Sequence, residues 1–102
     1  MDKNKNSSDR ERLKLELSNV FSQLKLEEVG DGIKVSVPNG SKSCNVTMKD
    51  GIYTVRSSNF LSTYKRLGDA VIEIMEDLVC REMFDNNFNS TEIGYVVSKL
   101  IK

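Results

Sequence analysis

Residues 33–56 read IKVSVPNGSKSCNVTMKDGIYTVR, and this stretch decides the fold. Apolar and polar side chains alternate along three short runs, as they do in strands that have one buried face. The pairs Asn39-Gly40 and Asp50-Gly51 separate the runs, and both pairs favour two-residue hairpin turns. We therefore predict a three-stranded antiparallel meander with strands at 33–37, 43–49 and 52–56.

Both turns predict the same register. If each turn is a two-residue loop, Val46 lies at the centre of the meander, with Ile33 on one side and Val55 on the other. A slip of one residue would move the apolar side chains to opposite faces. The predicted facing pairs are Val35–Cys44, Ile33–Val46, Val46–Val55 and Met48–Tyr53.

The other face of this meander is polar. It carries three cations and no acid, so it is either a solvated face, which is common in antiparallel sheets, or a binding face. Its predicted residues are Lys34, Ser36, Ser43, Asn45, Thr47, Lys49, Ile52, Thr54 and Arg56.

Residues 67–84, LGDAVIEIMEDLVCREMF, predict a central helix with two adjacent apolar stripes. Such a helix can pack on the sheet and also touch a second helix. The first stripe contains Leu67, Val71, Ile74, Met75 and Leu78, and the second contains Ile72, Val79 and Met83. The opposite side carries Asp69, Glu73, Glu76 and Asp77, with Phe84 in the same outward sector.

The remaining segments complete a single α+β domain over residues 9–102, preceded by a flexible polar leader at 1–8. A first helix is expected from Ser8 or Asp9 to about Leu24, and a last helix is expected to start at Asn89 with a capping box. Residues 57–66 fit either a loop or an early start of the central helix. The predicted order is α-β-β-β-α-α, with the helices packed on one face of the meander.

Charge is unevenly distributed along the chain, although the formal net charge is zero. Residues 1–66 carry 12 Lys and Arg against 8 Asp and Glu, a net charge of +4. Residues 67–92 carry seven acids against Arg81 alone, a net charge of −6. The acidic segment is either a solvated helix face or a patch that meets a basic partner.

The residue types argue against catalysis. Histidine is absent, which removes the commonest general base and the commonest metal ligand. Cys44 and Cys80 are far apart and have no metal-ligand spacing, so we expect free thiols in a reducing, cytoplasmic compartment. No apolar run is long enough to span a membrane. We expect no enzyme activity, no catalytic residue, no metal and no cofactor.

The predicted order α-β-β-β-α from Asp9 to Phe84 resembles that of double-stranded RNA-binding domains. This resemblance implies contacts through the first helix, the first hairpin loop and a basic cluster where the second helix starts. Lys42 lies beside that loop, and Lys65 and Arg66 precede the central helix. The full order is also similar to that of one phage anti-CRISPR family, whose members occupy nucleic-acid sites of their targets with an acidic surface.

We therefore expect a small non-enzymatic protein-binding module, an adaptor or an inhibitor, that occupies a partner's basic surface. An inhibitor of a nucleic-acid-handling enzyme, of the phage type, is one form of this function. The predicted contact residues are Asp69, Glu73, Glu76, Asp77 and Phe84. The alternative is a nucleic-acid-binding domain that uses Lys34, Lys42, Arg56, Lys65 and Arg66.

Overall fold

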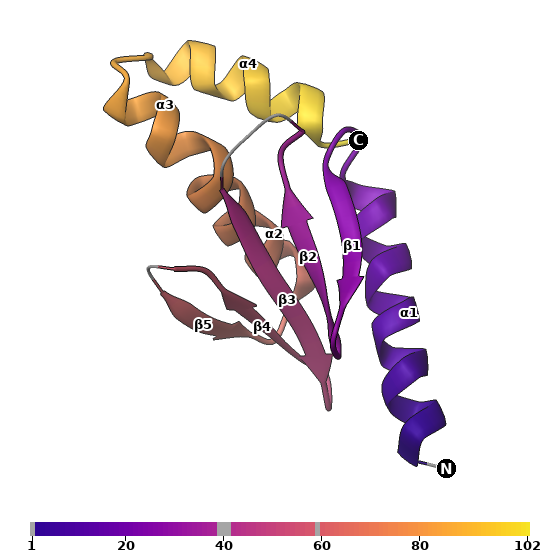
Figure 1. Ribbon diagram of the computed structural model, residues 1–102. Coiled ribbons are helices and arrows are strands. Elements are labelled where there is room, and N and C mark those ends of the chain that lie inside the picture. The colour runs from indigo at the N-terminus through magenta and orange to yellow at the C-terminus, as the bar shows by residue number, and fades with distance from the viewer. Residues whose placement is uncertain (1, 39–41, 59) are drawn as a thin grey trace.

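Five strands form one antiparallel sheet in the order β1-β2-β3-β4-β5, and helices cover one of its faces (Figure 1). The computed structural model describes residues 2–38, 42–58 and 60–102, with side chains from Asp9 onward. The elements are α1 (Asp2–Val20), β1 (Lys25–Val29), β2 (Gly32–Ser36), β3 (Ser43–Lys49), β4 (Ile52–Arg56), β5 (Leu61–Tyr64), α2 (Leu67–Met75), the π-helical turn η1 (Glu76–Cys80), α3 (Arg81–Asp85) and α4 (Ser90–Leu100).

The predicted register of the central strands is confirmed. Val46 lies opposite Ile33 in β2 and opposite Val55 in β4, and the other predicted pairs are also present. The β3–β4 turn has positive φ at both Asp50 (53°) and Gly51 (76°), as a type I′ hairpin requires. Asn39 and Gly40 lie outside the described residues, but the strands on either side of them pair as a two-residue loop predicts.

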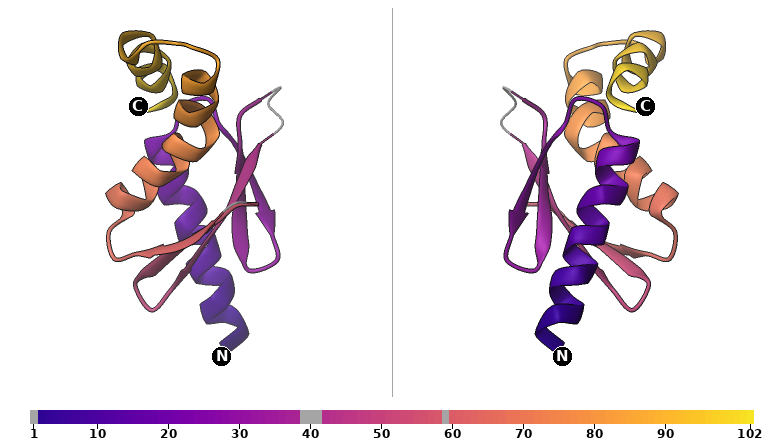
Figure 2. Two further views of the ribbon diagram at one scale, coloured as in Figure 1. Left: turned by 90° about the vertical axis from the view of Figure 1, so that its left-hand side faces the viewer. Right: turned by 90° about the vertical axis from the view of Figure 1, so that its right-hand side faces the viewer.

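The hydrophobic core lies between the sheet and the helices. Figure 2 shows α1 and the long helix formed by α2, η1 and α3 on the same side of the sheet. Strand side chains on the covered face are buried, whereas those on the other face, here named the open face, point away from the helices. The core residues of the sheet are Ile33, Val35, Cys44, Val46, Tyr53 and Val55.

The sheet is larger than the predicted meander because β1 and β5 extend it on both sides. Neither strand has the alternating pattern that identifies a half-buried strand. In β1 the apolar residues Leu26 and Val29 are three positions apart, and so are Leu61 and Tyr64 in β5. Both strands are defined by pairing with a neighbour, which satisfies their backbone groups. The observed element order, with five strands, therefore differs from the α-β-β-β-α order of the first resemblance and from the α-β-β-β-α-α order of the second.

The first helix starts earlier and ends earlier than predicted. Its backbone is helical from Asp2 to Val20, and Leu13 and Leu17 are fully buried. It is joined to β1 by Glu28, whose carboxylate pairs with Arg10 at 3.3 Å and with Lys14 at 4.0 Å. The flexibility expected for residues 1–8 stays a prediction.

The long helix begins at Leu67, the later of the two starts considered, and its last turn is followed by Asn87 with a positive φ of 67°. Its middle is not α-helical, because the Arg81 N–H donates to the Glu76 carbonyl, five residues back. This π-type bond places more residues in one turn than the 3.6 of an α-helix.

The last helix is held at both ends. At its start the predicted capping box is confirmed, because Asn89 and Glu92 exchange side chain-to-backbone hydrogen bonds of 2.9 and 3.1 Å. At its end the Ser22 N–H donates to the Leu100 carbonyl at 2.7 Å. The Lys102 N–H donates to the carbonyl of Val20, also at 2.7 Å, so α4 is tied to the end of α1.

We predict that Val46→Asp abolishes cooperative unfolding. Val46 is fully buried, and an isolated buried charge costs several kcal/mol against a total stability of roughly 5–15 kcal/mol. The matched control is Asn45→Asp, because Asn45 is the exposed neighbour on the open face. Thermal unfolding followed by circular dichroism tests both variants. A cooperative transition of Val46→Asp near the wild-type temperature would contradict the packing described here.

Candidate functional site

Four residues of the long helix form a line on its outer side: Ile72, Glu76, Cys80 and Phe84, here named the outer line. Residues four apart drift around a regular α-helix, because 3.6 residues make a turn. The π-helical turn at Glu76–Cys80 contains more residues per turn and removes most of this drift. The four side chains therefore lie one above the other, facing away from the sheet.

Large apolar side chains of the outer line are exposed to solvent. The side chain of Phe84 is 73% exposed and that of Ile72 is 59% exposed. Ile72 was predicted to belong to the second apolar stripe, which would touch another helix, and its exposure contradicts this. Val79 and Met83, the other members of that stripe, do pack in or against the core.

Two shallow hollows flank the outer line, and Glu76 lines both of them. The first has a volume of about 340 Å³ and lies between α2 and the end of β5. The second, of about 430 Å³, lies between the long helix and α4. The first is lined by Tyr64, Asp69, Ile72, Glu73 and Glu76, and the second by Glu76, Cys80, Arg81, Phe84, Asp85 and Ile93.

The predicted acidic side of the helix is present in part. Asp69 and Glu76 are exposed, as predicted. Glu73 is half-buried, and one of its oxygens, Oε1, accepts a hydrogen bond from the Tyr64 hydroxyl at 3.0 Å. The other oxygen, Oε2, is buried and has no hydrogen-bond partner among the described residues. Glu73 thus keeps an unused acceptor beside the first hollow.

Asp77 does not lie on the outward side where it was predicted, because its side chain is buried and only 4% exposed. It lies at the edge of the apolar stripe and is directed toward β3. Its Oδ2 accepts a hydrogen bond from the Cys44 thiol at 3.1 Å, and its Oδ1 is 3.6 Å from the Arg81 guanidinium. Asp77 therefore joins the helix to the sheet and is not part of the exposed acidic surface.

Both thiols are free, and their environments favour the protonated form. Burial raises the pKa of Cys44 strongly, and the adjacent Asp77 carboxylate raises the pKa further. Burial also raises the pKa of Cys80, as does the charge of Glu76. Cys44 faces the core, as predicted.

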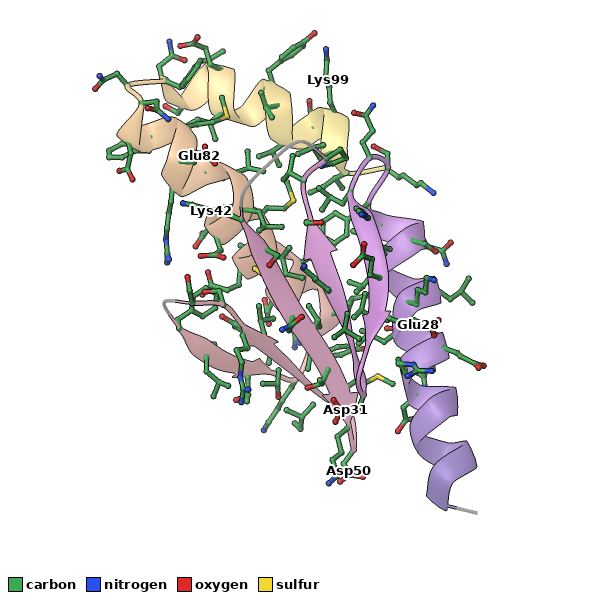
Figure 3. The ribbon with its side chains drawn as sticks, in the orientation of Figure 1. Glu28, Asp31, Lys42, Asp50, Glu82 and Lys99 are labelled. Carbon is green, nitrogen blue, oxygen red and sulfur yellow. The ribbon has the colours of Figure 1, made fainter. Side chains whose placement is uncertain are left out.

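The alternative set of basic residues is divided between two ends of the sheet. Lys42 and Arg56 line one cleft of about 340 Å³ at the end where the β4–β5 loop begins. Lys65 and Arg66 follow β5 at the opposite end, beside the β3–β4 turn that contains Asp50. Figure 3 shows Lys42 and Asp50 at these opposite ends, and seven-residue β3 separates them by about 20 Å.

Lys34 lies on the open face in one row with Asn45 and Arg56, because each residue of the row pairs with the next. The open face was expected to carry no acid, but β1 adds Glu27, which pairs with Lys25 at 2.7 Å. No aromatic side chain is placed on this face by the described strands. The row is thus a cationic strip without a platform for stacking bases.

The described residues show no grouping of three or more Cys, Asp or Glu side chains that would hold a metal ion. Within the same part of the chain, every helix is too short or too polar to cross a membrane. Comparisons with protein-family models, with curated proteins and with solved structures found no match.

The contact residues predicted from the sequence do not include three residues of the site: Ile72, Cys80 and Ile93. On a regular helix, Ile72 belongs to an apolar stripe and lies on a different side of the helix from Phe84. Only the π-helical turn brings Ile72 into line with Phe84, and no residue type within Glu76–Cys80 predicts such a turn from the sequence. Ile93 lies on α4, where its side chain is half-buried and lines the second hollow together with Phe84.

We predict that the stability of the protein falls as pH rises above about 9, in part because of Cys44. The unfolded chain loses this thiol proton near the ordinary pKa, whereas the folded chain retains it, because the folded pKa is raised. One such group lowers the unfolding free energy by up to about 1.4 kcal/mol per pH unit. In Cys44→Ser the hydroxyl can still donate to Asp77 but does not titrate. Denaturant unfolding from pH 8 to 10 should show a flatter slope for Cys44→Ser, and equal slopes would contradict the assignment.

Proposed function

We propose that the protein is a non-enzymatic binding module that acts by covering a basic surface of a partner protein. The contact surface is the outer line together with Asp69 and Glu73. One observation carries the proposal: Ile72 and Phe84, two large apolar side chains, are exposed on the same side of the helix as the acids. A row of acids alone is compatible with a solvated surface, whereas exposed apolar side chains within such a row are typical of contact sites.

This surface combines an exposed aromatic side chain with a charged rim, as protein–protein contact sites commonly do. An exposed aromatic residue serves as an anchor when it enters a pocket of the partner and loses its contact with water. Phe84 lies beside Ile93 and Cys80 in the second hollow, which is also lined by the charged residues Glu76, Arg81 and Asp85. The acids form the rim on the other side, around Glu76.

Charge makes the proposed partner basic. Residues 67–92 carry a net charge of −6, and Asp69 and Glu76 project into solvent from this segment. An acidic surface of this kind speeds the encounter with a basic partner and selects against acidic ones. If the basic surface of the partner is its own nucleic-acid site, the module acts as an inhibitor; otherwise it acts as an adaptor.

We predict that Asp69→Lys combined with Glu76→Lys slows association with the partner about 10-fold, because steering by charge is reversed. The partner is obtained by affinity capture from the source cell after nuclease treatment, and rates are measured by surface plasmon resonance. Stability should fall by no more than about 1 kcal/mol, since both side chains are exposed and only Asp69 favours the helix N-terminus.

The control for this double variant is Glu11→Lys combined with Asp31→Lys, which makes the same change of charge at exposed acids elsewhere. Phe84→Ala tests the anchor separately. It should raise Kd about 30-fold, mainly through a faster dissociation rate, because a hot-spot side chain contributes at least about 2 kcal/mol. If the partner binds both Phe84→Ala and the double variant Asp69→Lys with Glu76→Lys as tightly and as fast as it binds wild type, the contact surface lies elsewhere.

Nucleic-acid binding is the second candidate, and the row of Lys34, Asn45 and Arg56 is the observation that favours it. We expect no binding of duplex RNA at physiological salt, because the basic residues are split between two ends of the sheet. Fluorescence anisotropy over a range of salt concentrations measures this. Binding that falls steeply with salt and is lost in Lys34→Glu with Arg56→Glu would instead favour the open face as the functional site.

A further inference from the structure

We propose that the partner binds by adding an extended, basic segment as a new strand along the free edge of β5. This inference rests on the proposed function and specifies its geometry. The added strand would pair with the β5 backbone and place alternate side chains against the acidic side of α2. Figure 1 shows β5 at one edge of the sheet and β1 at the other, beside α1.

The two edges of the sheet differ in how they are protected. The β1 sequence KLEEV contains three charged residues, and Glu28 is held by Arg10 and Lys14 of α1. In addition, Arg10 donates a hydrogen bond to the Gly30 carbonyl at 2.6 Å. Charges and covering helices are the usual means of preventing strand addition. The β1 edge is therefore closed to a further strand.

The β5 edge has none of these features. Its sequence, LSTY, contains no charge and no proline, and β5 pairs with β4 alone among the described strands. In a ladder between two antiparallel strands, every second residue of the edge strand directs its N–H and C=O away from its neighbour. These groups are positioned to bond a strand of a partner, a mode of recognition known for exposed sheet edges.

The hollow of about 340 Å³ beside this edge defines the chemistry of the added strand. Tyr64 of β5 forms one wall, and Asp69, Ile72, Glu73 and Glu76 of the long helix complete the lining. The carboxylates of Asp69, Glu73 and Glu76 line this hollow together, so they favour an incoming ammonium or guanidinium group. Lysine or arginine at alternate positions of the added strand would direct positive charge toward this hollow.

The opposite side of the added strand has different neighbours. Thr63 and Leu61 lie on the open face of β5, because they pair with Thr54 and Arg56. The side chain of Leu61 is 54% exposed. Residues of the partner strand that point to this side would extend the open face and contact Leu61, which favours apolar side chains there. The predicted segment therefore alternates basic and apolar residues over about four to seven positions.

A synthetic peptide tests the inference even before the partner is identified. The probe is a capped heptapeptide that alternates lysine and valine, added to the ¹⁵N-labelled full chain and followed by NMR. We expect shifts of the Leu61–Tyr64 amides and intermolecular contacts between the peptide backbone and this strand. A second peptide carries N-methyl groups on alternate amides, which preserves side chains and charge but removes the strand hydrogen bonds. It should bind at least about 10-fold more weakly.

The outcomes separate this inference from the proposed function. Equal binding of both peptides, or unchanged β5 amides at saturating peptide or at the highest soluble concentration, overturns strand addition. If both peptides bind equally and Asp69→Lys with Glu76→Lys prevents that binding, the acidic surface still binds basic segments and only the β5 geometry is wrong. The control variant with Glu11→Lys and Asp31→Lys should bind both peptides as wild type does. A Glu73→Gln variant should weaken the unmodified peptide through loss of one charge while leaving the β5 contacts in place.

Discussion

The hydrogen bond from the Arg81 N–H to the Glu76 carbonyl is the feature on which both sides of the long helix depend. A regular helix would rotate the residues after Cys80, so that Phe84 would no longer lie above Ile72 and Glu76. The π-helical turn keeps Val79 buried and Phe84 exposed. Insertion of such a turn within a helix is common at functional sites, where it redirects side chains. Here it lets one helix build a core on its inner side and carry the proposed contact surface on its outer side.

Asp77 connects these two roles. Its carboxylate sits within the same turn, buried between the Cys44 thiol of β3 and the Arg81 guanidinium. A buried carboxylate requires hydrogen-bonding or charged partners, and Cys44 of β3 and Arg81 of the helix supply them. The hydrogen bond between Cys44 and Asp77 fixes the helix against β3, the central strand of the sheet. Of the four acids predicted to face outward, Asp69 and Glu76 remain exposed and Glu73 is half-buried beside β5, and these three belong to the proposed contact surface.

The sequence predicted the centre of the fold but not its edges. Two hairpin turns and strict alternation determined the register around Val46, because a shift of one residue would expose the whole apolar face. β1 and β5 lack alternation and depend on pairing with their neighbours, which no local pattern shows. The outward positions of Asp69, Glu76 and Phe84 followed from helical spacing. The burial of Asp77 did not, because it depends on the π-helical turn and on a contact with Cys44, 33 residues away.

The most direct test of the account is a footprint of the captured partner on the protein, measured by hydrogen–deuterium exchange or by NMR line broadening. If the outer line is the contact surface, the partner perturbs it around Glu76 and Phe84 and leaves Lys34 and Asn45 of the open face unchanged. Perturbation confined to the open face, around Lys34, Asn45 and Arg56, with the outer line unaffected, would contradict it. In that case the exposed apolar side chains of the long helix would have no part in binding, and the polar face of the sheet would be the functional surface.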